Sequence, residues 1–533
     1  MKGDEEDHGG KEADGRASQH PTMIAHGPLA ARARPDEPAA ATATMPVTVR
    51  RGCDKVPPAE KGPVRAMKRR ELIKLGFGSR ELADAAIAAV AAAARAGLKK
   101  TALRRRVHDL AASPEAFLGD QHFGELAAKL VDRGGENADA FVPRRSPAPY
   151  RQWGRDVDPE AVRQMENACA LPVAARGALM ADAHVGYGLP IGGVLATRDA
   201  VIPFAVGVDI ACRMKLSVVD LPPKALEGQT DRLRNALESE TRFGIGAAFR
   251  QRRSHDVLDE DWTVSPVTQR LKDKAWSQLG TSGSGNHFVE YGVLAVDAES
   301  ELGLAPGEYL AILSHSGSRG VGAAVADWYS KLAMELHPEL PKQLRHLAWL
   351  DLGSEPGQEY WRAMELMGDY ASANHAEIHR HLARALGVEV LASVENHHNF
   401  AWREEHGGET LIVHRKGATP AAAGDFGVIP GSMASPAFVV RGRGSDAALR
   451  SASHGAGRVM SRKKAKESFT WSQARRLLRE RGVTLLSAGL DEVPMAYRDI
   501  GEVMAAQADL VETLAVFEPR MVKMAPAGER PED

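Results

Sequence analysis

Apolar spacing divides the N-terminal part of the chain into two stretches. Residues 1–65 show little apolar periodicity and are rich in Asp, Glu, Gly, Pro and Ala, so we predict a disordered tail. Residues 66–135 have a helical pattern and form a predicted accessory segment. Strong helix formers fill residues 80–95 and 100–112, and residues 113–115 (Ser-Pro-Glu) have the form of a third helix start.

The rest of the chain mixes short β-rich runs with helical ones. A polar, Pro- and Gly-containing linker is predicted at residues 136–149, one large domain at residues 150–525, and a disordered C-terminus at residues 526–533. The predicted strands are residues 201–206, 212–219 and 410–414, and the predicted helices are residues 360–386 and 502–517. Because the order does not repeat as βαβ units, we predict an α+β fold with mixed and antiparallel sheets and packed helices.

Composition narrows the classes of function. The net charge of −2 and pI near 6.9 give no global basic field, so nucleic-acid binding would need a local patch. One candidate is the run Lys99, Lys100 and residues 104–106 (all Arg), which is either a solvated helix face or a surface that tracks phosphates. Three widely spaced Cys without a CxxC pair argue against disulfides and zinc fingers and favour a reducing cytoplasm. No apolar run reaches the roughly 18 residues of a membrane span.

Five motifs place His beside Gly or Ser, where backbone can approach a ligand closely. They are residues 182–193, 279–290, 314–322, 396–402 with 414–419, and 429–433 with 453–458. Ordinary turns explain one such motif more easily than five in one chain.

A carboxylate, a thiol and several imidazoles form a candidate metal site. The residues are Asp209, Cys212, His287, His315 and His398. These donors suit zinc, manganese, iron or cobalt rather than calcium. For each His the alternative is a hydrogen-bonded core or surface residue. His375 and His379, at helical i,i+4 spacing, are a competing pair, but they lack the Glu of His-Glu-x-x-His.

Phosphate chemistry has its own candidates. The chain contains neither Gly-x-x-x-x-Gly-Lys-Ser/Thr nor Gly-x-Gly-x-x-Gly, so a nucleotide would need another site, such as Gly-Ser-Gly-Asn and Pro-Gly-Ser-Met acting as anion nests. Candidate phosphate clamps are Arg319, Arg415, Lys416 and Arg458. His454, in His-Gly-Ala-Gly-Arg, can attack phosphorus and form a phosphoramidate, although it could also be a satisfied surface His.

At these motifs, over about residues 150–525, the sequence resembles the RtcB family of GTP- and manganese-dependent RNA ligases. The resemblance implies joining of RNA 3′-phosphate or 2′,3′-cyclic phosphate ends to 5′-hydroxyl ends through a guanylyl-histidine, in tRNA splicing or RNA repair. It also implies GTP and two Mn²⁺ ions per active site as cofactors, RNA as substrate, and an activating protein partner. A metal-dependent phosphodiesterase and a catalytically silent RNA-binding paralogue are the alternatives.

The resemblance also carries residue roles. Asp209, Cys212, His287, His315 and His398 would bind manganese, with Cys212 bridging two ions, and His454 would be guanylylated. The implied guanylate contacts are Asp182, Asn286, His287, Phe288, Val289, Glu290, His398, Asn399, Pro430, Gly431, Ser432, Met433, His454, Gly455, Ala456, Gly457 and Lys523.

The chain departs from the family pattern at three places. Arg213 follows Cys212 where Gly is common, and Met-Ala rather than Met-Pro precedes Asp182. Ala437 stands where the family usually has Ser, so that hydroxyl contact is lost or moved to Ser435. These departures leave the natural substrate more open than the chemistry.

Overall fold

The computed structural model describes residues 80–134, 141, 143–297 and 301–529, together with residues 72, 75 and 77. These residues belong to two compact units, and the boundary between the units falls between residues 138 and 139. The predicted tail at residues 1–65 and the last four residues of the predicted C-terminal tail lie outside the described residues. The domain boundaries drawn from the sequence stay predictions.

The smaller unit is helical. Its elements are α2 (Arg80–Arg95), α3 (Lys100–Ala112), the 3₁₀ helix η1 (Pro114–Phe117) and α4 (Gly124–Gly134). Leu103, Val107 and Leu110 lie on one face of α3 and are buried in the core of this unit. The two predicted helices are confirmed, but Ser113 begins only the 3₁₀ helix. The Asp120 carboxylate accepts the amides of His122 and Phe123, which holds the turn before α4.

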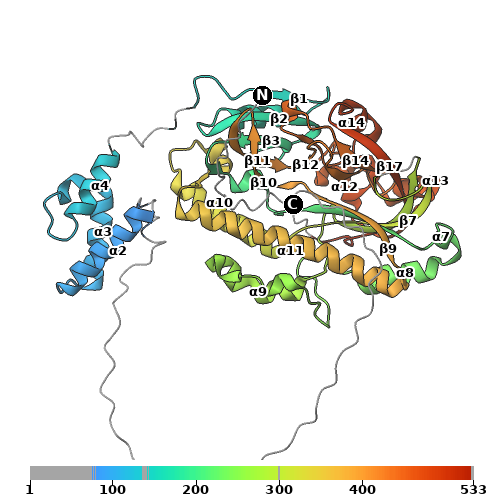
Figure 1. Ribbon diagram of the computed structural model, residues 1–533, viewed down its shortest axis with the longest axis horizontal. Coiled ribbons are helices and arrows are strands. Elements are labelled where there is room, and N and C mark those ends of the chain that lie inside the picture. Colours follow the sequence, from blue (N-terminus) through green and yellow to red (C-terminus); the bar gives the residue numbers. More distant parts are fainter. Residues whose placement is uncertain are drawn as a thin grey trace, which may run out of the picture. The chain divides into compact units, whose positions relative to one another are not determined.

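The larger unit contains two main sheets (Figure 1). One has the order β13-β14-β17-β6-β7-β5-β9 with β16 beside β17, and the other has the order β1-β2-β3-β11-β10. The strands of the first sheet are β5 (Arg213–Val219), β6 (Phe288–Val296), β7 (Gly307–Ser316), β9 (Val390–His397), β13 (Phe426–Pro430), β14 (Ala437–Gly442), β16 (Thr484–Ser487) and β17 (Val511–Met524). Those of the second are β1 (Tyr150–Gln152), β2 (Ala174–His184), β3 (Ile191–Thr197), β10 (Asn399–His406) and β11 (Glu409–Lys416). In these two sheets only β1–β2 and β16–β17 pair in parallel, which confirms the predicted α+β class.

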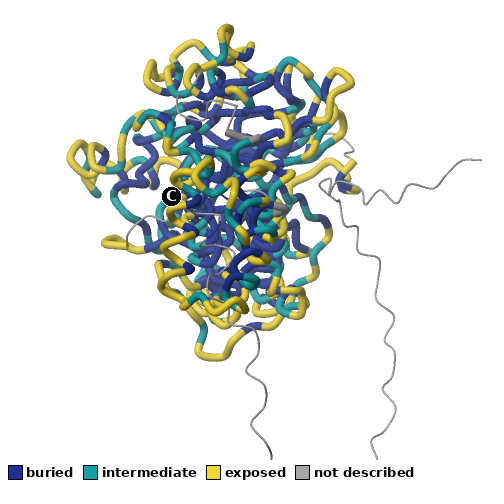
Figure 2. The backbone as a smooth tube through the Cα atoms, turned by 90° about the vertical axis from the view of Figure 1, so that its left-hand side faces the viewer, coloured by how far each residue is buried: buried dark blue, intermediate teal, exposed yellow. Residues whose placement is uncertain are grey.

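A 32-residue helix, α11 (Glu355–Leu386), packs against one face of the larger sheet (Figure 1). Its residues Ile378, Leu382 and Leu386 share a buried cluster with Tyr291 and Ile312 of the sheet. Figure 2 shows buried residues filling the interior of this unit. The predicted helix at 360–386 is confirmed, and it begins earlier because the Ser354 hydroxyl caps the Gly357 amide. Across the described residues, each helix is too short or too polar to cross a membrane.

Two secondary-structure predictions are wrong in part. The predicted helix at residues 502–517 ends at Ala506 in α14 (Ile500–Ala506), and residues 511–524 form β17. Pairing with β14 and β6 on both sides selects the strand, and the alternating burial of β17 agrees with it. The predicted strand at 201–206 turns into α6 (Pro203–Val206), because Pro203 fixes the first-turn φ of that helix. The strands predicted at 212–219 and 410–414 are confirmed as β5 and β11.

Candidate active site

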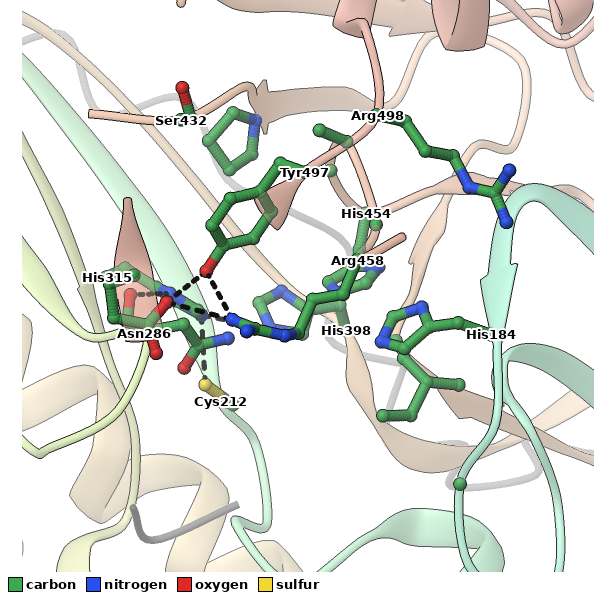
Figure 3. Close-up of a pocket in the computed structure, with 18 of the residues that line it drawn as sticks. His184, Cys212, Asn286, His315, His398, Ser432, His454, Arg458, Tyr497 and Arg498 are labelled. Atoms are coloured by element: carbon green, nitrogen blue, oxygen red, sulfur yellow. Dashed lines mark hydrogen bonds and ion pairs between the residues drawn. The ribbon is translucent and has the colours of Figure 1, made fainter. Parts of the chain in front are cut away.

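A cavity of about 970 Å³ lies between the two main sheets (Figure 3). From the larger sheet it is lined by Phe288 and Glu290 of β6 and His315 of β7. From the smaller sheet it is lined by Asn399 of β10 and Lys416 of β11. Polar and apolar groups from both sheets therefore converge on one space large enough for a nucleotide.

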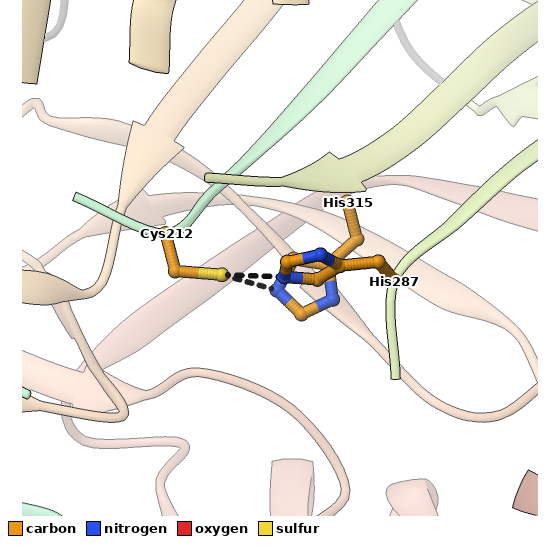
Figure 4. Close-up of side chains that lie close together, drawn as sticks. All are labelled: Cys212, His287 and His315. Atoms are coloured by element: carbon orange, nitrogen blue, oxygen red, sulfur yellow. Dashed lines mark hydrogen bonds between the residues drawn. The ribbon is translucent and has the colours of Figure 1, made fainter. Parts of the chain in front are cut away.

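Cys212, His287 and His315 form a compact cluster at one side of this cavity (Figure 4). The Cys212 Sγ atom lies 3.3 Å from His287 Nε2 and 3.1 Å from His315 Nε2. Strands β5, β6 and β7 lie next to one another, and these residues sit at or beside the ends of those strands. Sheet pairing therefore brings together side chains that are up to 103 positions apart in the chain.

The other two predicted metal ligands border the same cluster. His398 follows β9, and its Nε2 lies 3.3 Å from His315 Nε2. Asp209 Oδ2 lies 3.2 Å from His287 Nε2, and Asp209 Oδ1 accepts the Ser318 amide at 3.1 Å. A Cβ atom at Gly317 would lie 2.1 Å from Asp209 Oδ2, so a side chain at position 317 would displace the Asp209 carboxylate.

The electrostatics of the cluster suit a bound cation. Burial lowers the pKa of His315 and of His398 well below the usual range, so both imidazoles are neutral near pH 7. Burial acts to raise the pKa of Asp209, but the hydrogen bond and charge of His287 outweigh it and hold that pKa below its usual value. Among the described residues, the Nδ1 atoms of His287 and His398 have no hydrogen-bond partner. Neutral imidazoles, a thiol and a carboxylate are donors that fit a transition metal or zinc.

His454 lies beside the cluster, with its ring centroid 5.0 Å from that of His398. Its Nδ1 lies 2.7 Å from Oδ2 of the fully buried Asp182. The same oxygen accepts the amides of His454 and Gly455 at 3.1 and 3.2 Å. A proton on Nδ1 satisfies this contact, which leaves a lone pair on Nε2.

Most of the predicted guanylate contacts line the cavity. They are Asn286, His287, Phe288, Glu290, His398, Asn399, Pro430, Gly431, Ser432, Met433, His454, Gly455, Ala456 and Gly457. Asp182 instead lies behind His454, and Val289 is buried in the core on the other face of β6. The Lys523 Nζ donates to the carbonyls of Leu237 and Thr241 rather than lining the cavity. The roles of these residues stay predictions.

The alternative metal pair and two of the phosphate clamps have other partners. Both rings of the pair His375 and His379 are hydrogen-bonded on each nitrogen, sharing the Ser314 hydroxyl at 2.7 Å. Arg415 pairs with Glu404 at 2.6 Å, and the buried Arg319 donates to the Ser282 carbonyl at 2.9 Å. These contacts indicate a structural role for both histidines and for both arginines.

The other two proposed clamps, Lys416 and Arg458, do line the cavity. Burial lowers the pKa of Lys416 to about 7, and its Nζ donates to the Tyr187 carbonyl at 2.6 Å. Arg458 approaches Glu492 and the Tyr497 hydroxyl, both at 3.2 Å (Figure 3). Either cation could therefore face an anionic ligand.

The structure also places the departures from the family pattern. Arg213 points away from the cavity, and its guanidinium pairs with Glu395 and donates to the Gly368 carbonyl at 3.1 Å. Ala437 lines the cavity without a hydroxyl, while the Ser435 and Ser432 hydroxyls lie 2.9 Å apart on the same wall.

Sequence reasoning missed several residues that line the cavity, among them Arg462 and Glu492. Figure 3 labels three more, His184, Tyr497 and Arg498. His184 and Arg462 lie within or near recognised motifs. The other three are more than 30 positions from His454, and no local pattern marked them.

Comparisons with known proteins show the family of the chain. The family model described as tRNA-splicing ligase RtcB matches residues 164–264 and 260–524. The RNA-splicing ligase RtcB of Escherichia coli K12 is 35% identical over 403 residues, covering 69% of this chain and 95% of the relative. The tRNA-splicing ligase RtcB of Nanoarchaeum equitans is 30% identical over 420 residues, covering 65% and 87% respectively. That of Thermococcus kodakarensis is 29% identical over 435 residues, covering 67% and 89%. With this match over most of its length, the chain belongs to the RtcB family.

Proposed function

We propose that this protein is an RNA ligase that joins 3′-phosphate or 2′,3′-cyclic phosphate ends to 5′-hydroxyl ends in tRNA splicing or RNA repair. The names of its relatives support RNA splicing as the reaction class. The observation that carries the proposal is the pairing of His454 Nδ1 with buried Asp182 beside the Cys/His cluster. A phosphodiesterase needs the metals, but it does not need an oriented imidazole nucleophile.

The cluster would hold two Mn²⁺ ions. We assign Asp209, Cys212, His287, His315 and His398 as the residues that would hold these ions. When bound, the ions supply positive charge that stabilises negative charge on phosphate oxygens. The convergence of the Cys212 Sγ atom with the Nε2 atoms of His287 and His315 supports this assignment.

His454 would be the nucleophile. Its Nε2 attacks the α-phosphorus of GTP, a P–N bond forms, the bond to the bridging oxygen breaks, and pyrophosphate leaves. Asp182 keeps the proton on Nδ1 and stabilises the positive charge that develops on the ring. The guanylyl group on His454 is then transferred to an RNA 3′-phosphate.

The last step would close the RNA strand. The 5′-hydroxyl attacks the activated 3′ end, the new phosphodiester forms, and GMP leaves. A 2′,3′-cyclic end is first hydrolysed to the 3′-phosphate. The cationic side chains on the wall, Lys416 and Arg458, are positioned to hold RNA or guanylate phosphates.

Joining of two labelled RNA strands tests the proposal. With GTP and Mn²⁺, the protein should join a 3′-phosphate strand to a 5′-hydroxyl strand, and His454→Ala should abolish joining. His337→Gln is the matched control, because His337 pairs with Glu339 outside the cavity. Opening of a cyclic end by a wild-type protein that joins no strands with GTP and Mn²⁺ would instead support the phosphodiesterase. We further propose a cytoplasmic location and an activating protein partner.

A further inference from the structure

Charge is concentrated in the segment that follows His454. Between positions 458 and 481 the sequence has nine Lys and Arg and two Glu, whereas the whole chain carries a net charge of −2. This segment contains α12 (Arg462–Ser468) and α13 (Trp471–Glu480). Asp491 and Glu492, outside this segment, pair with Arg458, Arg462 and Lys466, so the positive charge left to attract a polyanion includes the arginines of α13.

A hollow of about 390 Å³ lies along α13. Its lining is one half-buried indole, two guanidinium groups and an apolar floor: Trp471, Arg475, Leu478, Arg479, Val483, Leu485, Leu486, Ser487 and Ala488. Trp471, Arg475 and Arg479 follow one another at i, i+4 and i+8, so they share one helix face. The Arg475 guanidinium carbon lies 6.0 Å from the centre of the Trp471 ring.

The two guanidinium groups at this hollow are available to a ligand. Within the part of the chain that the structure describes, Arg475 and Arg479 are exposed and neither pairs with a carboxylate. Arg476, on the same helix, lies 3.8 Å from Glu480 instead. Phosphates at the hollow could therefore be neutralised by Arg475 and Arg479.

The hollow is connected to the proposed ligation site. Arg462 lines the active-site cavity and begins α12, which leads into α13. Leu478 and Val483 on the floor share an apolar cluster with Met433 and Met524, which line the cavity. The hollow and the cavity therefore border the same apolar cluster.

We propose that this hollow binds a nucleotide of the single-stranded RNA substrate outside the ligation site. The base stacks on Trp471, and the flanking phosphates contact Arg475 and Arg479. An aromatic ring beside unpaired guanidinium groups is the combination that binds single strands without reading their sequence. The identity of the occupant as RNA rests on the proposed ligase function.

Binding of a fluorescent 12-nucleotide 3′-phosphate RNA, measured by anisotropy over a range of salt, tests the proposal. Arg475→Gln with Arg479→Gln should lower the slope of log affinity against log salt by about 1.4, or 0.7 for each phosphate contact. Trp471→Leu should weaken binding roughly 5- to 100-fold with little change in slope. Trp471→Phe keeps an aromatic ring and should restore much of the affinity. Arg476→Gln, which removes one positive charge from the same helix away from the hollow, should bind with the wild-type slope.

Formation of the guanylyl adduct from labelled GTP, which needs no RNA, separates the two proposals. If the Trp471 and Arg475/Arg479 variants bind RNA more weakly but form the adduct as wild type does, RNA binding at the hollow is supported. If these variants instead have the RNA affinity and salt slope of Arg476→Gln, RNA binding at the hollow is refuted, and the proposed ligase function is unaffected. If the wild-type protein forms no adduct, the proposed ligase function is refuted. The RNA-binding measurements would still test the hollow.

Discussion

Asp182→Asn removes one charge and keeps the shape of the side chain. Asp182 Oδ2 accepts three hydrogen bonds, from His454 Nδ1 and from the amides of His454 and Gly455. An Asn can keep these bonds only by placing its oxygen at the Oδ2 position. Its amide group then occupies the Oδ1 position, which is buried and has no hydrogen-bond partner in the described structure.

The magnitude follows from that contact. A hydrogen bond to a charged group contributes about 1.5–3 kcal/mol, and a buried donor left unpaired costs about 1–3 kcal/mol. Loss of the charge alone therefore slows attack by His454 about 10- to 150-fold. The flipped amide would favour the wrong imidazole tautomer, and the comparable change in a serine-protease triad lowers kcat by about 10⁴. The combined effect should lie between the loss of charge alone and the full effect of a wrong imidazole tautomer. We therefore expect guanylylation to slow by about 10²- to 10⁴-fold.

Single-turnover incorporation of α-labelled GTP, with protein in excess, measures this rate. Asp261→Asn is a matched control, because Asp261 accepts the Thr263 amide in a surface turn away from the cavity. Thermal unfolding checks that Asp182→Asn remains folded. A rate within threefold of wild type in a folded variant would refute the role of Asp182 in orienting His454.

Two further changes test the site and its support. Cys212→Ser should lower bound Mn²⁺, measured by elemental analysis after dialysis, while Cys169→Ser, a change at a buried cysteine outside the cavity, should retain it. Equal metal content in both would contradict the ligand assignment. Burial acts to raise the pKa of Glu395, but the charges of Lys215 and Arg213 outweigh it and hold that pKa below its usual range. The stabilisation is therefore present above about pH 4.3 and is lost as the pH falls further, so Glu395→Gln should cost about 2–3 kcal/mol at pH 7 and much less near pH 3. Urea unfolding at both pH values measures this, and a cost independent of pH would count against the ion pairs.

The sequence could indicate metal and phosphate chemistry because the residues of each motif lie within a few positions of one another. Gly and His together in a short loop are visible in the sequence, and so was the proximity of Asp209 to Cys212. What the sequence could not supply is the order of strands. His287, His315 and His398 meet because β6, β7, β5 and β9 are neighbours in the sheet.

Contacts between distant parts of the chain also explain the wrong helix prediction at residues 502–517 and the surroundings of Arg213 and Lys523. Residues 511–517 look helical in isolation, yet β14 and β6 hold them as a strand on both sides. Arg213 had no explanation from the sequence, because its partner Glu395 lies 182 positions away on the adjacent strand β9. Lys523, implied as a guanylate contact, is directed to two backbone carbonyls by the fold around it.

The site of covalent attachment tests the central claim most directly. Protein incubated with α-labelled GTP and Mn²⁺ should carry an acid-labile guanylyl group, and peptide mass spectrometry under alkaline conditions should place it on His454. His454→Ala should carry none, while His337→Gln should be labelled as wild type. Attachment to a Lys, or labelling that persists in His454→Ala, would contradict the account.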